Sequence, residues 1–250
     1  MKKHNTTFYI FFVSLIVLAL ASIEDDFKKH DLDKNEQISK KELKLWLKAA
    51  RLLYYRKHSD LRMVEIGLKE GKVDWNSFIF SLFGLNEMNE EFENVMNNNK
   101  LTINIYSARW KAADKDRDNK LNAEEFFTFE NPELVPRLRD LLAYETINSL
   151  DNDKDWQLNE KEFIKGLNPG DETKYNAEEK LFWKNQRDQF KHFLDVDGDL
   201  KLGREEVKRW ITNKMKENIL IKRKQVFVKC DTNRNKYLEI EEIKKCQGFV

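Results

Sequence analysis

The chain has 250 residues, of which 36% are charged and 12% aromatic, and its formal net charge is +1. So many aromatic residues argue against a disordered chain, and the length allows one to three compact units. The near-neutral charge gives no reason to expect a nucleic-acid partner. With 8 Gly and 3 Pro and little strand-like alternation, the sequence predicts an all-α fold.

The first 21 residues have the pattern of a secretory signal peptide. Two lysines precede an apolar stretch from Phe8 to Leu20, and Ala19-Leu20-Ala21 fits a cleavage site. An uncleaved membrane anchor is the competing interpretation, but a span needs about 20 apolar residues. We therefore expect a mature chain that begins near Ser22, lies in the secretory pathway or outside the cell, and is not inserted in a membrane.

The next element is a 12-residue segment, 31–42, with oxygen-bearing side chains at positions 1, 3 and 5, an aliphatic residue at 8 and Glu at 12. The pattern returns at 114–125, 151–162, 195–206 and 231–242. A tight loop of this kind can offer Ca²⁺ about seven oxygens, including the carbonyl of position 7 and both oxygens of the Glu. Acidic solvated turns would not need this Glu each time. The repeat predicts five EF-hand calcium loops.

The predicted ligands occupy the same positions in each loop. Side chains act at positions 1, 3, 5 and 12, and the backbone carbonyl acts at position 7. The ligands are Asp31, Asp33, Asn35, Gln37 and Glu42; Asp114, Asp116, Asp118, Lys120 and Glu125; Asp151, Asp153, Asp155, Gln157 and Glu162; Asp195, Asp197, Asp199, Lys201 and Glu206; and Asp231, Asn233, Asn235, Tyr237 and Glu242. We number these loops 1, 3, 4, 5 and 6.

Loop 2 is a degenerate copy at 66–77. Gly71 and Val73 stand at positions 6 and 8, but Ile66 and Leu68 replace the first two ligands and Ser77 replaces the Glu. We expect this loop to bind no calcium and still to supply a short strand to a partner loop.

The loops begin 35, 48, 37, 44 and 36 residues apart. Short steps alternate with long ones, so the spacing predicts three tandem pairs, (1,2), (3,4) and (5,6), each joined by a two-stranded contact at position 8. The predicted domains are 22–85, 101–167 and 177–250, with linkers around Asn97–Asn99 and Asn168–Asp171. Helices are expected at 41–57, 75–83, 103–113, 124–129, 133–150, 160–167, 178–194, 204–214, 219–229 and 240–246. Their Trp and Phe residues would form the core or, alternatively, a target-binding groove.

Position 6 sets the expected affinity. Gly is usual there because the backbone needs a positive φ, yet none of the five loops has it. Another residue costs about 1–2 kcal/mol, which is roughly 5- to 30-fold in affinity. We expect dissociation constants near the 10⁻⁴–10⁻³ M of extracellular modules.

The two cysteines, Cys230 and Cys246, flank loop 6 on different helices. They could form a disulfide in an oxidising compartment, but free or intermolecular thiols are the favoured interpretation.

Several segments beside the loops resemble the calumenin and reticulocalbin family of multiple EF-hand proteins. They are Val73–Trp75 before Phe83-Gly84, Arg109–Asp114, Glu124–Glu133 and Glu205–Ile211. The resemblance implies a low-affinity calcium binder of the endoplasmic reticulum, Golgi or extracellular space that folds or regulates client proteins. Such proteins usually end in an HDEL-like tetrapeptide, whereas this sequence ends in Gln247-Gly248-Phe249-Val250. Retention in the endoplasmic reticulum and secretion both stay open.

Three functions can be weighed from these features. A calcium-dependent binder of client proteins is the leading hypothesis, and a passive calcium store is the alternative. An enzyme is not expected, because the 4 His form no HExxH motif and the carboxylates are assigned to the loops.

Overall fold

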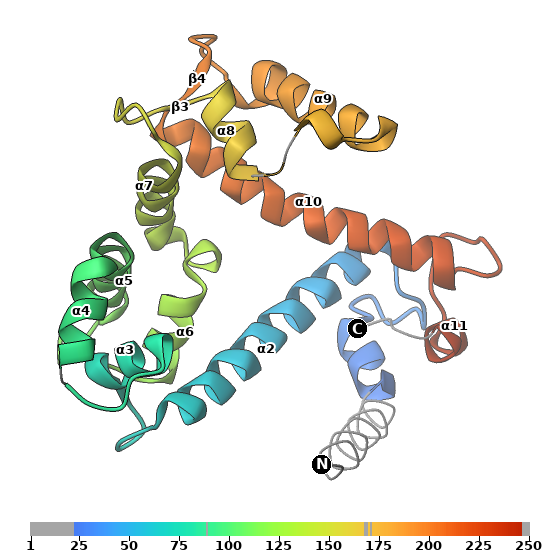
Figure 1. Ribbon diagram of the computed structural model, residues 1–250. Coiled ribbons are helices and arrows are strands. Elements are labelled where there is room, and N and C mark those ends of the chain that lie inside the picture. The colour runs from blue at the N-terminus through green and yellow to red at the C-terminus, as the bar shows by residue number, and fades with distance from the viewer. Residues whose placement is uncertain (1–22, 89, 168–169, 171, 247–250) are drawn as a thin grey trace, which may run out of the picture. The chain divides into compact units, whose positions relative to one another are not determined.

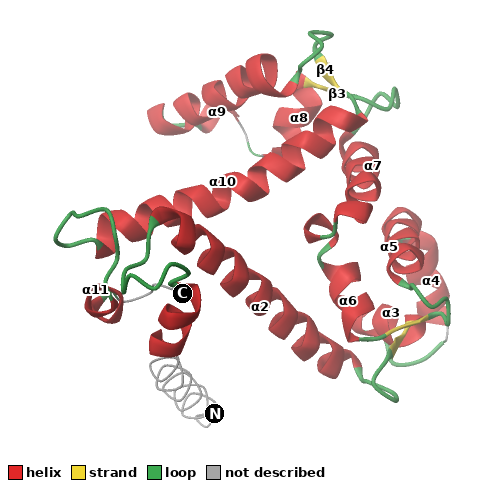
Figure 2. Ribbon diagram, turned by 180° about the vertical axis from the view of Figure 1, so that it is seen from behind, coloured by secondary structure: helices red, strands yellow, loops and turns green. Residues whose placement is uncertain are grey.

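The computed structural model describes residues 23–88, 90–167, 170 and 172–246. The predicted signal peptide, most of the Asn168–Asp171 linker and the last four residues lie outside the described residues. The described part is all-α, as predicted, with short strands between loops (Figures 1 and 2). No helix in it has both the length and the apolar character that crossing a membrane requires.

The helices and strands follow one another in a simple order. After a helix at 23–30, the α-helices are α2 (Lys40–Ile66), α3 (Trp75–Phe83), α4 (Glu90–Asn98), α5 (Lys100–Ala113), α6 (Ala123–Glu130), α7 (Arg139–Leu150), α8 (Glu160–Leu167), α9 (Ala177–Gln189), α10 (Arg204–Cys230) and α11 (Ile240–Lys245). The strands are β1 (Val73–Asp74), β2 (Lys120–Leu121), β3 (Leu158–Asn159) and β4 (Lys201–Leu202). Short 3₁₀ turns occupy η1 (Pro132–Leu134), η2 (Pro136–Leu138) and η3 (Glu172–Lys174), and a π-helical turn, η4, covers Phe190–Leu194.

The loops pair through position 8, as predicted, but with other partners. Val73 of loop 2 pairs antiparallel with Leu121 of loop 3, and Leu158 of loop 4 with Leu202 of loop 5. Ile38 of loop 1 pairs with Leu238 of loop 6. The pairs are therefore (2,3), (4,5) and (1,6). The predicted tandem partners are wrong, and the three predicted domain ranges do not coincide with these pairs.

The reason for the difference is the continuity of two helices. α2 runs for 27 residues from loop 1 to loop 2, and α10 for 27 residues from loop 5 to loop 6. A helix of this length is about 40 Å long, so the loops at its two ends cannot meet. The predicted break between 204–214 and 219–229 is absent from α10, and α2 continues nine residues beyond the predicted end at Lys57.

Chain-breaking residues lie where the chain does turn back. Gly84 caps α3 with a φ of 69° between loops 2 and 3, and Pro169 and Gly170 lie between loops 4 and 5. In the segment predicted to be a linker, Asn97 and Asn98 end α4, and only Asn99 separates α4 from α5. Neither α2 nor α10 contains Gly or Pro. The absence of Gly and Pro from α2 and α10 is therefore the sequence feature that indicates the pairing. Breakers between loops do not indicate it by themselves, because Pro132 and Pro136 lie between loops 3 and 4, which do not pair.

Each pair has its own hydrophobic core, built around its two position-8 residues, all six of which are fully buried. Ile38 and Leu238 pack with Phe27, Leu43 and Trp46. The other two cores gather most of the remaining aromatic residues. One contains Val73, Leu121, Phe78, Trp110, Phe126 and Phe129, and the other contains Leu158, Leu202, Phe163, Trp183 and Phe190.

The chain divides into two compact units. One consists of Met1–Tyr54 with Met215–Val250, and the other is Tyr55–Lys214. The first unit contains pair (1,6), and the second contains pairs (2,3) and (4,5). Within the second unit, the guanidinium of Arg109 on α5 donates through Nε to Glu145 on α7 at 3.3 Å, and Glu145 is only 5% exposed.

Candidate metal centres

The Glu at position 12 is held in the same way in all five predicted calcium loops. One carboxylate oxygen of Glu42 accepts a hydrogen bond from the backbone N–H of Leu32 (2.8 Å), and the other accepts from Ser39 (2.9 Å). These are positions 2 and 9 of the loop. The same two bonds, at 2.7–3.1 Å, fix Glu125, Glu162, Glu206 and Glu242.

These five carboxylates are only 4–7% exposed. Burial opposes ionisation of Glu42, but the N–H groups of Ser39 and Leu32 outweigh it, so the pKa of this carboxyl lies below its ordinary value. The carboxylate form of Glu42 is thus favoured, and in all five loops the backbone holds the position-12 side chain in one place.

The Asp at position 1 turns the loop by binding its own backbone. Asp31 accepts from the N–H of Glu36, at position 6, at 2.9 Å. The equivalent bonds, at 2.9–3.1 Å, join Asp114 to Asn119, Asp151 to Trp156, Asp195 to Leu200 and Asp231 to Lys236. The position-6 residues have φ between 62° and 69°. The left-handed backbone expected there is confirmed, and it is adopted by residues with a Cβ.

Positions 3 and 5 complete the turn. In loop 4, Asp153 accepts from the N–H of Asp155 at 3.3 Å, and Asp155 accepts from Gln157 at 2.9 Å. Each short side chain thus bonds the backbone two residues ahead, which keeps successive oxygens on the inner side of the loop.

These turns bring carboxylates close together in four of the loops. One oxygen from each of three acidic residues lies within 4.8 Å of the others in each group. The groups are Asp31, Asp33 and Glu42; Asp114, Asp116 and Asp118; Asp151, Asp153 and Glu162; and Asp195, Asp197 and Asp199. Such crowding of carboxylates is unfavourable unless a cation balances their charge.

Two buried carboxylate oxygens provide a test of fit for a cation. Within the described residues, Oδ1 of Asp114 and Oδ1 of Asp231 are buried and have no hydrogen-bond donor. Leaving a buried acceptor unpaired costs about 1–3 kcal/mol, and more when it is charged. A cation at position 1 of loops 3 and 6 would satisfy both atoms. An all-oxygen donor set with a bidentate Glu suits Ca²⁺.

Loop 2 has a different conformation. Lys69 and Lys72 exchange two backbone hydrogen bonds of 3.0 Å, and between them Glu70 and Gly71 have φ of 55° and 77°. Positive φ at both central residues is typical of a tight type I′ turn. Loop 2 supplies β1 to the pair, as predicted, and it is a hairpin turn rather than a 12-residue ligand loop.

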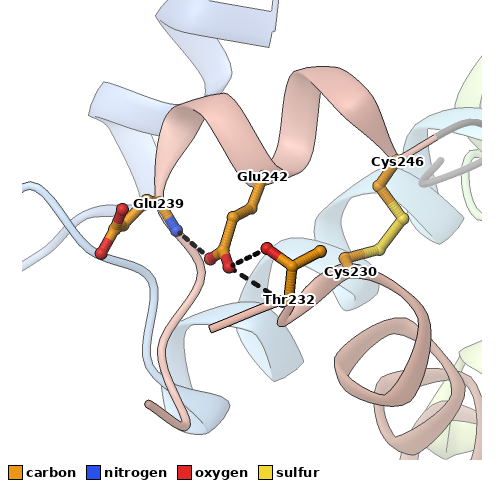
Figure 3. Close-up of a disulfide and its surroundings, with 5 residues drawn as sticks. All are labelled: Cys230, Thr232, Glu239, Glu242 and Cys246. Atoms are coloured by element: carbon orange, nitrogen blue, oxygen red, sulfur yellow. Dashed lines mark hydrogen bonds between the residues drawn. A yellow bond between two sulfur atoms is a disulfide. The ribbon is translucent and has the colours of Figure 1, made fainter. Parts of the chain in front are cut away.

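Loop 6 is closed by a disulfide between Cys230, at the end of α10, and Cys246, which caps α11 (Figure 3). Their Cα atoms are 5.3 Å apart. The preference for free thiols is therefore wrong. Both cysteines belong to the core of pair (1,6), which brings the ends of the two helices together. The sequence shows only that the cysteines lie on different helices. The same view shows Glu242 accepting from Thr232 and Glu239 inside the loop.

Two lysines reach from one loop into the ligands of its partner. Lys72 Nζ of loop 2 lies 3.0 Å from Oδ2 of Asp116 in loop 3 and also contacts Asp118. Lys201 Nζ of loop 5 contacts Asp155 of loop 4. Hydrogen bonding to Lys72 lowers the pKa of Asp118, and hydrogen bonding to Lys201 lowers the pKa of Asp155. Both lysines stand at position 7 of their loops. The loop pattern assigns a ligand role to the backbone carbonyl at this position and none to the side chain.

Comparison with known proteins adds independent support. No protein-family model and no solved structure matches the chain. Mouse (Mus musculus) reticulocalbin-3 is 29% identical over 180 residues, which are 70% of this chain and 53% of the relative, and the human (Homo sapiens) protein is 28% identical over the same length. The 45 kDa calcium-binding protein of Gallus gallus is 28% identical over 240 residues, 89% of this chain and 67% of the relative. The chain is thus similar to reticulocalbin-3 and to the 45 kDa calcium-binding protein along most of its length.

The chain spans about half the length of the reticulocalbin-3 sequences it matches. The match agrees with the resemblance that the segments beside the loops carry. In loops 1, 3, 4 and 5, three of the predicted acidic ligands lie close together. The disulfide and the lysines that contact the partner loop emerge only from the structure.

Proposed function

We propose that the chain is a low-affinity calcium-binding protein whose loops 1, 3, 4, 5 and 6 each hold one Ca²⁺. The observation that carries the proposal is the shared loop geometry, in which a buried position-12 Glu and a position-1 Asp are fixed by the loop's own backbone. The unpaired oxygens of Asp114 and Asp231 support it, and so does the similarity to the 45 kDa calcium-binding protein. Loop 2 is proposed to bind none.

The protein is further proposed to work in the secretory pathway, retained or secreted. The disulfide supports this location, because such bonds persist in oxidising compartments. The apolar N-terminal segment of the sequence points the same way. Calcium is abundant in these compartments, so sites with dissociation constants near 10⁻⁴–10⁻³ M would be occupied there.

A calcium-dependent binder of client proteins is the function we favour over a passive store. Large apolar side chains are exposed in loop 5, at Val196 (60%) and Leu200 (65%), and just before it, at Phe193 (75%). Val196 also donates its N–H to Glu206 at 2.7 Å. Since the same loop positions the ligands and these side chains, calcium occupancy would set the surface offered to a client. No catalytic role is proposed.

Calorimetric titration of the chain purified from a secretory host tests this proposal, with circular dichroism and binding of an apolar dye followed at each calcium concentration. About five weak sites with a change in dye binding would support a calcium-dependent binder. Weak binding with no change would favour the passive store. No binding would contradict the assignment of these loops as metal sites.

A further inference from the structure

Lys72 lies in loop 2, the loop without calcium ligands, and hydrogen bonds hold its backbone in place. Both backbone groups of Lys72 are hydrogen-bonded to Lys69 across the turn, at 3.0 Å. The next residue, Val73, is fully buried and paired with Leu121 of loop 3. The Cα of Lys72 is therefore fixed beside loop 3, and only its side chain is free to move.

The ammonium group of Lys72 lies at the ligand oxygens of loop 3. It is 3.0 Å from Oδ2 of Asp116 and in hydrogen-bond contact with Oδ2 of Asp118, at positions 3 and 5. The Lys72 side chain is only 28% exposed, so these contacts are partly sheltered from water. The ammonium group of Lys72, with one positive charge, thus contacts two of the carboxylates that a bound Ca²⁺ would need.

The arrangement occurs twice, which makes a chance rotamer a poor explanation. In pair (4,5), Lys201 at position 7 of loop 5 contacts Asp155 at position 5 of loop 4. The relation between the two positions is the same as for Lys72 and Asp118. Pair (1,6) has Gln37 and Tyr237 at position 7, so no lysine can act in this way from that position.

We propose that Lys72 is a built-in counter-cation of loop 3, which holds Asp116 and Asp118 together when calcium is absent and must be displaced when calcium binds. On this account, which rests on the proposed calcium-binding function, loop 2 is a regulator of its partner's affinity rather than a lost site. Lys201 acts likewise on loop 4, with a smaller effect because it contacts one carboxylate instead of two.

Two opposite changes are expected when Lys72 is replaced by Gln. Calcium-free protein becomes less stable, because two ion pairs are lost, and loop 3 binds calcium about threefold to tenfold more tightly, because no ammonium has to leave. A residue that only supported the loop structurally would lower stability and affinity together. The opposite signs therefore separate the two roles.

The test is a calcium titration followed by the backbone amide resonance of Asn119, which reports on loop 3 alone because its N–H bonds to Asp114. Lys69→Gln is the matched control: it removes the same charge from the same turn, but Lys69 contacts Asp74, at 3.7 Å, and is 75% exposed. Thermal unfolding in a chelator gives the second readout. Lys72→Gln should tighten calcium binding at loop 3 and lower the Tm of the calcium-free protein. Lys69→Gln should change both quantities much less.

Each alternative outcome decides a different question. If Asn119 of the unmodified protein does not respond to calcium, the proposed function of loop 3 fails. If it responds, and Lys72→Gln binds calcium no more tightly than Lys69→Gln, the counter-cation role is overturned while the calcium site stands.

Discussion

Pairs (1,6) and (2,3) reach the same fold by different means. In pair (1,6), both loops carry ligands, the two partners come from opposite ends of the sequence, and a disulfide closes loop 6. In pair (2,3), one loop is a hairpin turn without ligands, and a core rich in aromatic residues, with Phe78 against Trp110 and Phe129, joins the two. Both pairs share the position-8 contact and a hydrophobic core, although loop 2 lacks the ligand pattern.

The difference predicts where each pair gets its stability. Bringing distant ends of a chain together costs more conformational entropy than closing a short connection. In pair (1,6), the disulfide and the two proposed calcium ions would offset this cost. Pair (2,3) relies on packing and on the Lys72 contacts with loop 3.

Removing calcium should have the largest effect. A site with a dissociation constant near 10⁻⁴ M adds about 2.7 kcal/mol of stability when calcium is a hundredfold higher. Pair (1,6), with two sites, should lose about 5 kcal/mol in a chelator, and pair (2,3), with one, about half as much. Hydrogen exchange at the amides of Ile38 and Leu238 measures the loss of stability in pair (1,6). Exchange at Val73 and Leu121 measures the loss in pair (2,3). Equal losses would contradict the comparison.

Removing the disulfide should have the next largest effect. Replacing both Cys230 and Cys246 by Ser opens a closed loop with a sequence separation of 16, for which chain entropy predicts about 3 kcal/mol. The loss should appear in hydrogen exchange at Leu238 and leave Leu121 unchanged, because the second unit contains neither cysteine. An equal loss at both positions would show that the two units unfold as one.

Introducing Gly at position 6 should have the smallest effect and the opposite sign. Glu36 has a φ of 62° and Asn119 of 63°, and Asn tolerates this region better than Glu. Glu36→Gly should tighten calcium binding at loop 1 by about 5- to 30-fold, and Asn119→Gly should tighten loop 3 by less. Site-resolved titration of both variants checks the order, and Glu36→Gln controls for the lost charge. A larger gain at loop 3 would contradict the backbone argument.

The sequence predicts much of this molecule because EF-hand loops are defined locally. Ligand type and spacing locate the five loops, and α3 and α8 have their predicted bounds. The partners could not be read from spacing, because a step of 35 or 36 residues fits a helical hairpin and a single long helix equally well. The absence of Gly and Pro from α2 and α10 was the available signal.

The missed features of the site depend on that pairing. Lys72 reaches loop 3 only because loops 2 and 3 are partners, and nothing in the residues near Lys72 along the sequence indicates its carboxylate contacts. Cys230 and Cys246 meet because the core of pair (1,6), to which both belong, brings the ends of α10 and α11 together. The loop pattern also gave no sign of the backbone conformation at position 4. The non-glycine residues there with positive φ are Lys34, Arg117, Lys154 and Arg234.

The pairing of loop 1 with loop 6 is the central feature of the fold. In the structure, Ile38 N–H donates to the Leu238 carbonyl at 2.9 Å, and Leu238 N–H donates back at 3.0 Å. Nuclear Overhauser spectra of the calcium-loaded protein should therefore show cross-strand contacts between the backbones of Ile38 and Leu238, and between Val73 and Leu121. Contacts that instead join Ile38 to Val73 and Leu202 to Leu238 would restore the tandem pairing and contradict the account.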